Sequence, residues 1–178
     1  MHDPPLNLDN VEVYKLTKNL FDIDNFECSN SIYENYIKDE AYKDQANAIA
    51  QTWVFVNDKN VIGYVSIAMG DLNKTQHEKL RVFPHTNVPG LLLGRLATNK
   101  KYEGKGVGRK MVDWVFAEAI SYAENIGCRI VYLNPEEGVV TWYSEKLHFA
   151  HIPKKNNQDI MFYDLELYKK QSTSRILD

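Results

Sequence analysis

The chain has 178 residues, 44% of them hydrophobic and 12% aromatic, and its 21 basic and 24 acidic residues leave a net charge of −3. That length and apolar content suit one well-packed domain and exclude a disordered chain. The sequence has no stretch of 18 apolar residues and no basic-then-apolar secretory signal at its start. We therefore expect a cytoplasmic protein with reduced cysteines, no membrane attachment and, since no His and Cys residues have zinc-ligand spacing, no metal site.

Alternating and continuous apolar runs predict a mixed α/β sheet of six or seven strands, with helices on both faces. The second and third strands form a predicted hairpin with a four-residue loop at 57–60. Residues 70–89 lack clear periodicity and predict a loop or short helix near the site. We expect one domain over 11–168, with a flexible arm at 1–10 and a tail at 169–178. In chain order, the expected strands are residues 11–16, 52–56, 61–68, 91–98, 129–133, 148–152 and 160–167.

Helical spacing of apolar residues and one terminal signal predict the helices. Ser31 with Glu34 three residues later is typical of a capping box, and it predicts a helix with Ile32, Tyr36 and Ile37 on one side. The clearest helix carries eight apolar residues at helical spacing and meets a natural stop at Gly127. The expected helices cover residues 31–51, 107–126 and 138–147.

The charge of the chain is segregated along the sequence. Residues 1–50 contain four basic and ten acidic residues, whereas residues 74–110 contain nine basic and two acidic ones. The densest part of this basic block, Lys100 to Lys110, interleaves its charges with glycines. Because glycine lets a ligand approach the backbone N–H groups, this pattern indicates an anion site.

The glycine-rich segment 102–108, Tyr-Glu-Gly-Lys-Gly-Val-Gly, follows a predicted strand and opens the longest predicted helix. A helix N-terminus offers unpaired N–H groups and about half a positive charge, so the segment predicts a cradle for a pyrophosphate. Its glycines fall at alternate positions, which fits neither the P-loop nor the dinucleotide-binding fingerprint.

The same segment resembles the acetyl-CoA loop of the GNAT acetyltransferase superfamily, which reads Gln/Arg-x-x-Gly-x-Gly/Ala after a strand. Glu103 stands here in the Gln/Arg position. Residues 138–149 resemble a later motif of that superfamily, with Tyr143 at its tyrosine and His148 in place of its usual glycine. The resemblance implies a three-layer fold in which a mixed, partly splayed sheet binds acetyl-CoA.

The resemblance also implies roles for individual residues. Backbone groups at the end of the strand would pair with the pantetheine arm, and the loop would hold the pyrophosphate. Tyr143 would give a proton to the leaving thiolate of CoA, since a phenol with a pKa near 10 is protonated at neutral pH. The implied acetyl-CoA-binding residues are Leu96, Ala97, Thr98, Glu103, Gly104, Lys105, Gly106, Val107, Gly108 and Arg109.

The expected reaction is direct transfer of an acetyl group to a primary amine, and its acceptor stays open. Many relatives place a glutamate near the strand before the loop, but this chain has Gly94 and Arg95. Without a strong base an α-amine, with a pKa of about 7.7–8.0, is a better acceptor than a lysine, with a pKa near 10.4. His85 is either a base or a surface residue, Arg95 either contacts substrate or supports the structure, for example paired with Asp71, and Cys28 is expected to pack rather than react.

A narrower resemblance concerns the acceptor. Residues 26–29, 62–67 and 88–97 are similar to the toxin acetyltransferases of toxin–antitoxin pairs, which acetylate the amino acid on charged tRNA. It implies charged tRNA as acceptor, an antitoxin as partner and a homodimer. A small amine or a peptide or protein N-terminus is the alternative acceptor, and a non-enzymatic acyl-CoA-binding module is a third interpretation.

Overall fold

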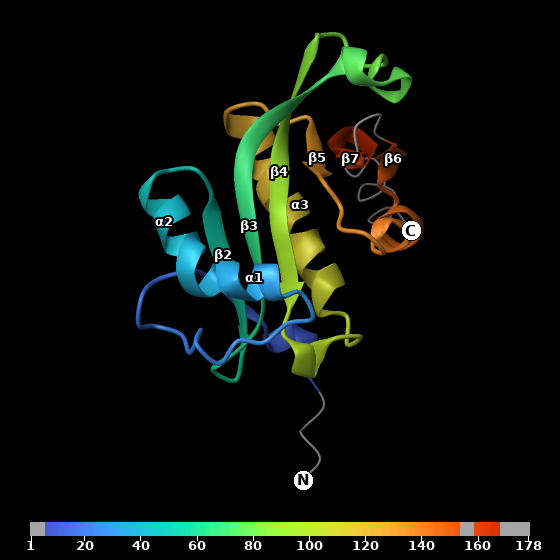
Figure 1. Ribbon diagram of the computed structural model, residues 1–178. Coiled ribbons are helices and arrows are strands. Elements are labelled where there is room, and N and C mark those ends of the chain that lie inside the picture. The colour runs from blue at the N-terminus through green and yellow to red at the C-terminus, as the bar shows by residue number, and fades with distance from the viewer. Residues whose placement is uncertain (1–5, 154–158, 168–178) are drawn as a thin grey trace. The chain divides into compact units, whose positions relative to one another are not determined.

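The computed structural model of the protein describes residues 6–153 and 159–167 (Figure 1). Within these residues one seven-stranded sheet has the order β1-β2-β3-β4-β5-β7-β6. The β4–β5 pair is parallel, whereas the β1–β2, β2–β3, β5–β7 and β6–β7 pairs are antiparallel, so the sheet is mixed as predicted. The strands are β1 (Glu12–Lys15), β2 (Gln51–Asn57), β3 (Asn60–Asn73), β4 (Asn87–Thr98), β5 (Ile130–Leu133), β6 (Ala150–Ile152) and β7 (Ile160–Asp164).

Three α-helices and several single turns accompany the strands in the described residues. A π-helical turn, Tyr36–Glu40, joins the first two α-helices, and a second one covers Trp142–Lys146. None of the described helices combines the length and apolar character needed to cross a membrane. The α-helices are α1 (Ser31–Asn35), α2 (Ala41–Ala46) and α3 (Val107–Asn125), and the 3₁₀ turns are Leu8–Asn10, Lys74–Gln76, Glu78–Leu80 and Lys100–Tyr102.

The chain divides into two compact units. The first unit comprises Met1–Ala68 and Gly94–Trp114, and the second comprises Met69–Leu93 and Val115–Asp178. Strands β3 and β4 and helix α3 therefore each contribute to both units. Of the predicted arm and tail, residues 1–5 and 168–178 lie outside the described residues.

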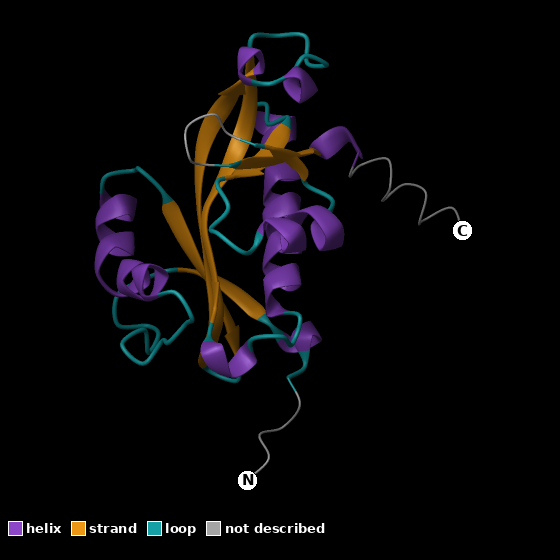
Figure 2. Ribbon diagram, turned by 45° about the vertical axis from the view of Figure 1, so that its right-hand side comes forward, coloured by secondary structure: helices purple, strands orange, loops and turns teal. Residues whose placement is uncertain are grey.

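In the first unit, helices cover both faces of β2. Val54 and Val56 lie in a buried cluster with side chains of the α1–α2 segment, such as Ile37. The other side chains of β2 contact α3. The centre of the Trp114 ring lies 5.2 Å from that of Trp53 and 5.7 Å from that of Phe55. Side chains of a strand alternate between its faces, so this pattern produces the predicted three layers (Figure 2).

The start of α1 differs from the predicted capping box by one residue. Asn30 is the N-cap, and its side chain accepts a hydrogen bond from the Ile32 amide at 2.9 Å. Glu34 instead accepts from the Cys28 amide at 3.3 Å. Of the three apolar residues expected on one side of this helix, two are buried and Ile32 is 64% exposed. The helical segment ends at Ala46 rather than near residue 51.

The β2–β3 hairpin has a two-residue loop, not the predicted four-residue loop. Asn57 pairs with Asn60, which leaves Asp58 and Lys59 to make the turn. Both have positive φ, 47° and 68°, as a type I′ turn requires. All four turn residues are polar, so composition alone could not locate the last pair of the ladder.

In the second unit, a buried cluster joins β4, β5 and β7 to the segment between β3 and β4. That segment was predicted as a loop or short helix over 70–89, but β3 extends to Asn73 and β4 begins at Asn87. The Lys74 amide donates to the Thr86 carbonyl at 2.8 Å, so the end of β3 and the start of β4 form a long hairpin. The cluster comprises Leu72, Leu80, Phe83, Val88, Ile130, Tyr132, Ile152, Ile160 and Phe162.

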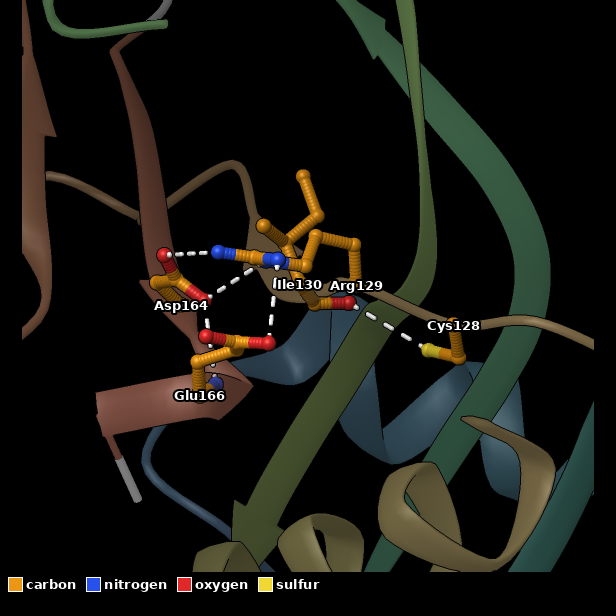
Figure 3. A network of polar contacts seen from close by, with 5 residues as sticks. All are labelled: Cys128, Arg129, Ile130, Asp164 and Glu166. Atoms are coloured by element: carbon orange, nitrogen blue, oxygen red, sulfur yellow. Dashed lines mark hydrogen bonds and ion pairs between the residues drawn. The ribbon is translucent and has the colours of Figure 1, made fainter. Parts of the chain in front are cut away.

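An arginine network joins the start of β5 to the end of β7 in this unit (Figure 3). Arg129 donates from Nε and Nη2 to the two carboxylate oxygens of Asp164, both at 2.9 Å. Its Nη1 lies 3.4 Å from Oε1 of Glu166. The Leu165 amide donates to the Arg129 carbonyl at 3.0 Å, and the backbone turns helical there. The predicted continuation of this strand to residue 167 is therefore wrong.

Candidate functional site

The end of β4 leads into the glycine loop through an anchored turn in the first unit. The Asn99 amide donates to the Ile62 carbonyl at 2.9 Å, and its side-chain amide donates to the Val61 carbonyl at 3.2 Å. The next amide, of Lys100, donates to the Glu27 carbonyl at 2.8 Å. These bonds tie the loop entrance to β3 and to the segment before α1, so the loop starts from a fixed point.

The glycine loop has the backbone that an anion cradle needs. Gly104 and Gly106 have φ of +72° and +85°, a region that side chains with a Cβ rarely adopt. The first helical bond of α3 runs from the Lys110 amide to the Gly106 carbonyl at 3.1 Å. The amides of Val107 and Gly108 precede that bond and belong to the positive end of a 19-residue helix.

The surface of the loop is open to a ligand. Residues 103–106 are exposed, and a Cβ built on Gly104 would meet no atom within 4 Å. Two cations lie on the loop: the Lys105 ammonium lies 5.5 Å from the Tyr102 ring centre, and Arg109 pairs with Asp113 at 3.2 Å. The loop thus offers exposed amides, a helix N-terminus and positive charge, a combination that fits a pyrophosphate.

Glu103 has a partner that the sequence did not suggest. Its Oε1 accepts a 2.6 Å hydrogen bond from the Ser29 hydroxyl, which lies just before α1. The bond holds the carboxylate toward Ser29. A second tie between the loop and the residues before α1 therefore comes from side chains 74 positions apart in sequence.

The strand before the loop extends past its pairing with β5. The β4–β5 register covers Gly90 to Leu92, and β4 then continues to Thr98. The side chain of Ala97 is buried in the cluster with the α1–α2 segment. Leu96 and Thr98, at alternate positions, are partly buried. The backbone of residues 94–98 thus extends beyond the described β5 register, as the predicted splay requires.

Arg95 stacks on an aromatic ring of the first unit. Its guanidinium carbon lies 3.9 Å from the ring centre of Tyr36, and its Nε is buried without a hydrogen-bond partner. The Tyr36 hydroxyl donates to Asp44 at 3.0 Å and lies 2.9 Å from the Ser66 hydroxyl. Burial raises the pKa of Tyr36, so its ring stays neutral under the cation.

Tyr143 lies in the second unit, on the π-helical turn Trp142–Lys146. It is 6% exposed, and its ring makes edge contacts with Trp142 at 4.8 Å and Phe149 at 5.5 Å. His148 has φ of +59°, a left-handed conformation that explains why a glycine is usual at this place in the motif. The first unit holds residues 96–98 and 103–109, and the second holds Tyr143.

The remaining candidates take simple positions. The Cys28 thiol donates to the Asn30 carbonyl at 3.1 Å, and burial raises its pKa, which disfavours the nucleophilic thiolate and fits the predicted packing role. Cys128 is buried, and both thiols are free. His85 is exposed. Ser29 and Tyr36 were missed because their partners are distant in sequence.

Comparisons with known proteins address the family. The model of the acetyltransferase (GNAT) family matches residues 15–149. A tRNA-acetylating toxin of Mycobacterium tuberculosis is 23% identical over 114 residues, which are 64% of this chain and 69% of the toxin. The structure of AtaT complexed with acetyl-methionyl-tRNAfMet superposes with a TM-score of 0.80 at 17% identity, over 90% of this chain and 98% of AtaT.

A further structure is a Tyr-to-Phe mutant of the toxin AtaT, bound to acetyl-CoA and to the C-terminus of the antitoxin AtaR. It superposes with a TM-score of 0.77 at 17% identity, over 93% of this chain and 99% of that one. These likenesses confirm the predicted fold. The family match covers well over half of the chain, which therefore belongs to the acetyltransferase (GNAT) family and is an N-acetyltransferase that uses acetyl-CoA.

Proposed function

We propose that the acceptor is the α-amine of an amino acid esterified to tRNA. The observation that carries this proposal is the sequence similarity to a tRNA-acetylating toxin over 69% of that toxin's length. The likeness in fold to AtaT, whose complex contains acetyl-methionyl-tRNA, supports it. By analogy with AtaT bound to the C-terminus of AtaR, we propose an antitoxin as a protein partner. From the resemblance to the toxin acetyltransferases, we also propose a cytoplasmic homodimer as the working form.

The chemistry of the strand before the loop favours the same acceptor. Residues 94–98 of β4 carry a guanidinium and no carboxylate, so they supply no base for a lysine amine. An α-amine with a pKa of about 7.7–8.0 is unprotonated for a substantial fraction of the time near neutral pH. A site that mainly positions the amine can therefore acetylate it.

We propose that two segments, the glycine loop and the end of β4, bind different parts of acetyl-CoA. Acetyl-CoA supplies the thioester whose C–S bond is cleaved. The loop Glu103–Arg109 holds the pyrophosphate on its amides, and backbone groups of Leu96, Ala97 and Thr98 pair with the pantetheine arm. A backbone N–H of the splayed strand polarises the thioester carbonyl.

Tyr143 is proposed as the acid of the reaction. The amine nitrogen forms a bond to the carbonyl carbon, the C–S bond breaks, and the sulfur takes the phenolic proton of Tyr143. The amine releases its proton to solvent, and a proton from solvent then restores the phenol of Tyr143. The products are an N-acetylated aminoacyl-tRNA and CoA with a free thiol.

Transfer of label to charged tRNA tests this function. Purified protein is incubated with radiolabelled acetyl-CoA and either total aminoacylated tRNA or the same tRNA after deacylation. We expect label to enter acid-precipitable RNA only when the tRNA is charged. Label on a panel of small amines or peptide N-termini, with none on charged tRNA, would contradict the proposal and leave the acetyltransferase activity standing.

A further inference from the structure

Arg95 carries a charge that the described part of the chain does not neutralise. No carboxylate lies within ion-pair distance of its guanidinium, and its buried Nε has no hydrogen-bond acceptor. Arg95 is half-buried, and a buried donor such as its Nε almost always has an acceptor. A partner that is not part of this unit therefore accounts best for this side chain.

The surroundings of Arg95 fix its position. The Tyr36 ring lies beneath the guanidinium at 3.9 Å, and that ring belongs to the π-helical turn between α1 and α2. The Tyr36 hydroxyl gives its one proton to Asp44, so the Ser66 hydroxyl donates to the same oxygen. Two hydrogen bonds thus brace the ring, and the ring supports the cation.

The residue before Arg95 leaves room for a ligand. Gly94 is exposed although it lies within β4, and a Cβ built on it would meet only the Ser66 carbonyl, at an ordinary 3.5 Å. The protein itself therefore does not require a glycine at this position. A glycine inside a strand that no neighbour explains marks close approach of a ligand or another backbone.

We propose that Arg95 anchors the acceptor by binding its phosphate, the phosphodiester that precedes the terminal adenosine of aminoacyl-tRNA. This inference rests on the proposed function. The amino acid on tRNA is an ester and has no carboxylate, so that phosphodiester is the anion closest to the reacting amine. A guanidinium suits it because its planar fork donates two parallel hydrogen bonds to phosphate oxygens.

A pair of minimal substrates differs by the phosphodiester and the cytidine that it joins, and the substitutions below assign the part due to the phosphate. Adenosine carrying a 3′-aminoacyl ester lacks the phosphodiester, and the same ester on the dinucleotide CpA contains it. We expect the wild-type protein to use the dinucleotide with a KM about tenfold lower or more, as hydrogen bonds to a charged group would give. Equal KM values for the two substrates would overturn the inference.

Substitutions assign that preference to Arg95. Arg95→Gln is expected to raise KM for the dinucleotide about tenfold, with little change in kcat and none in KM for the adenosine ester. Arg95→Lys keeps the charge without the fork and is expected to recover part of the loss. Lys59→Gln removes one exposed charge from the β2–β3 turn and is the control. An equal loss on both substrates would mean a structural role and overturn the inference.

A binding measurement separates this inference from the proposed function. Calorimetry with CpA that carries no amino acid needs no transfer, and we expect Arg95→Gln to weaken its binding about tenfold. Unchanged binding would overturn the inference even if charged tRNA is acetylated. A different result would be that Arg95→Gln raises KM for a free amino acid but not for the corresponding amino acid amide. The anion bound by Arg95 would then be a carboxylate, and the phosphodiester would be excluded.

Discussion

Two arginines, one on β4 and one just before β5, show how the same side chain is placed for different purposes. Arg129 in the second unit donates twice to Asp164 at 2.9 Å, approaches Glu166 at 3.4 Å and lies 5.3 Å from the Phe83 ring centre. Arg95 in the first unit lies over the Tyr36 ring at 3.9 Å and pairs with no carboxylate of the described residues. The charge of Arg129 is thus paired with carboxylates, whereas the charge of Arg95 is not.

The difference teaches which of the two serves the fold. The carboxylates of Asp164 and Glu166 hold Arg129 across the β5–β7 pair, and its pKa is raised chiefly by the hydrogen bond to Asp164. The charge of Arg129 therefore contributes to the stability of the folded protein. A cation left without a carboxylate contributes little to folding and is available to a ligand.

The largest effect should come from the group proposed to carry the reaction. Tyr143→Phe keeps the ring and its contacts with Trp142 and Phe149 but removes the acidic proton. Loss of general acid catalysis lowers kcat by about 10²–10⁴-fold. Steady-state kinetics measures the loss, and calorimetry with acetyl-CoA should show unchanged affinity.

A matched control makes that result specific. Tyr132→Phe removes the same atom from another buried tyrosine of the second unit, and we expect its kcat to stay within about twofold of wild type, because its hydroxyl has no proposed part in the proton transfer. Equal losses in both variants would argue against Tyr143 as the acid.

Two glycines of β4 differ in the same way, since packing requires one of them and leaves the other free for a ligand. A Cβ on Gly90 would lie 2.6 Å from Ile130 Cγ1, so Gly90→Ala is expected to lower the free energy of unfolding by about 1–3 kcal/mol. Gly94→Ala should change it by less than about 0.5 kcal/mol and raise KM for aminoacyl-tRNA. Urea unfolding and kinetics on both variants check this, and an unstable Gly94→Ala protein would remove Gly94 from the argument for a ligand.

Arg129→Gln sharpens the comparison of the arginines directly. It removes two charge-assisted hydrogen bonds from Asp164, and because Arg129 is 36% exposed we expect a loss of about 1–2 kcal/mol in the free energy of unfolding. That corresponds to a fall in Tm of about 2–8 °C. Arg95→Gln should lower Tm less, and the reverse order in thermal unfolding would refute the assignment.

The strained residue near Tyr143 should be replaceable with a gain. His148 is exposed and has φ of +59°, so His148→Gly relieves the left-handed strain at some cost in unfolded-state entropy. We expect the free energy of unfolding to rise by about 0.5–1 kcal/mol with kcat unchanged. A lower kcat in this variant would mean that the histidine itself takes part in the reaction.

The smallest effect concerns a partly buried ion pair. The Lys38 ammonium, 2.8 Å from Glu34, and then the Cys28 amide hold the pKa of Glu34 below its ordinary value of 4.5. A lowered folded-state pKa means that the stabilisation is present above that ordinary value and is lost as pH falls through the folded pKa. Acid unfolding of Glu34→Gln should therefore show a shallower loss below pH 4.5. A curve that matches wild type would mean that the pair contributes nothing.

Local signals in the sequence predicted the parts of the site that depend on neighbouring residues. Glycines beside Lys105 at the start of an apolar helix are enough to predict an anion cradle, and Gly104 and Gly106 of this loop have positive φ. The departure at His148 marked the strained turn. Where two adjacent residues could both cap, as Asn30 and Ser31 can, composition could not choose between them, and the N-cap was predicted one residue too late.

Other parts could not be predicted because they depend on contacts between distant residues. The role of Arg95 was left open, since its setting comes from Tyr36, Asp44 and Ser66 on three other elements. The bond between Ser29 and Glu103 joins segments 74 residues apart. No spacing rule within either segment indicates such a contact.

The most direct test is the identity of the acetylated product. tRNA charged with one amino acid is incubated with acetyl-CoA and the protein and then digested with nuclease, and the terminal nucleoside is analysed by mass spectrometry. We predict adenosine that carries an N-acetylated aminoacyl ester. Recovery of the unmodified aminoacyl-adenosine, under conditions in which the protein acetylates another amine, would contradict the proposed function.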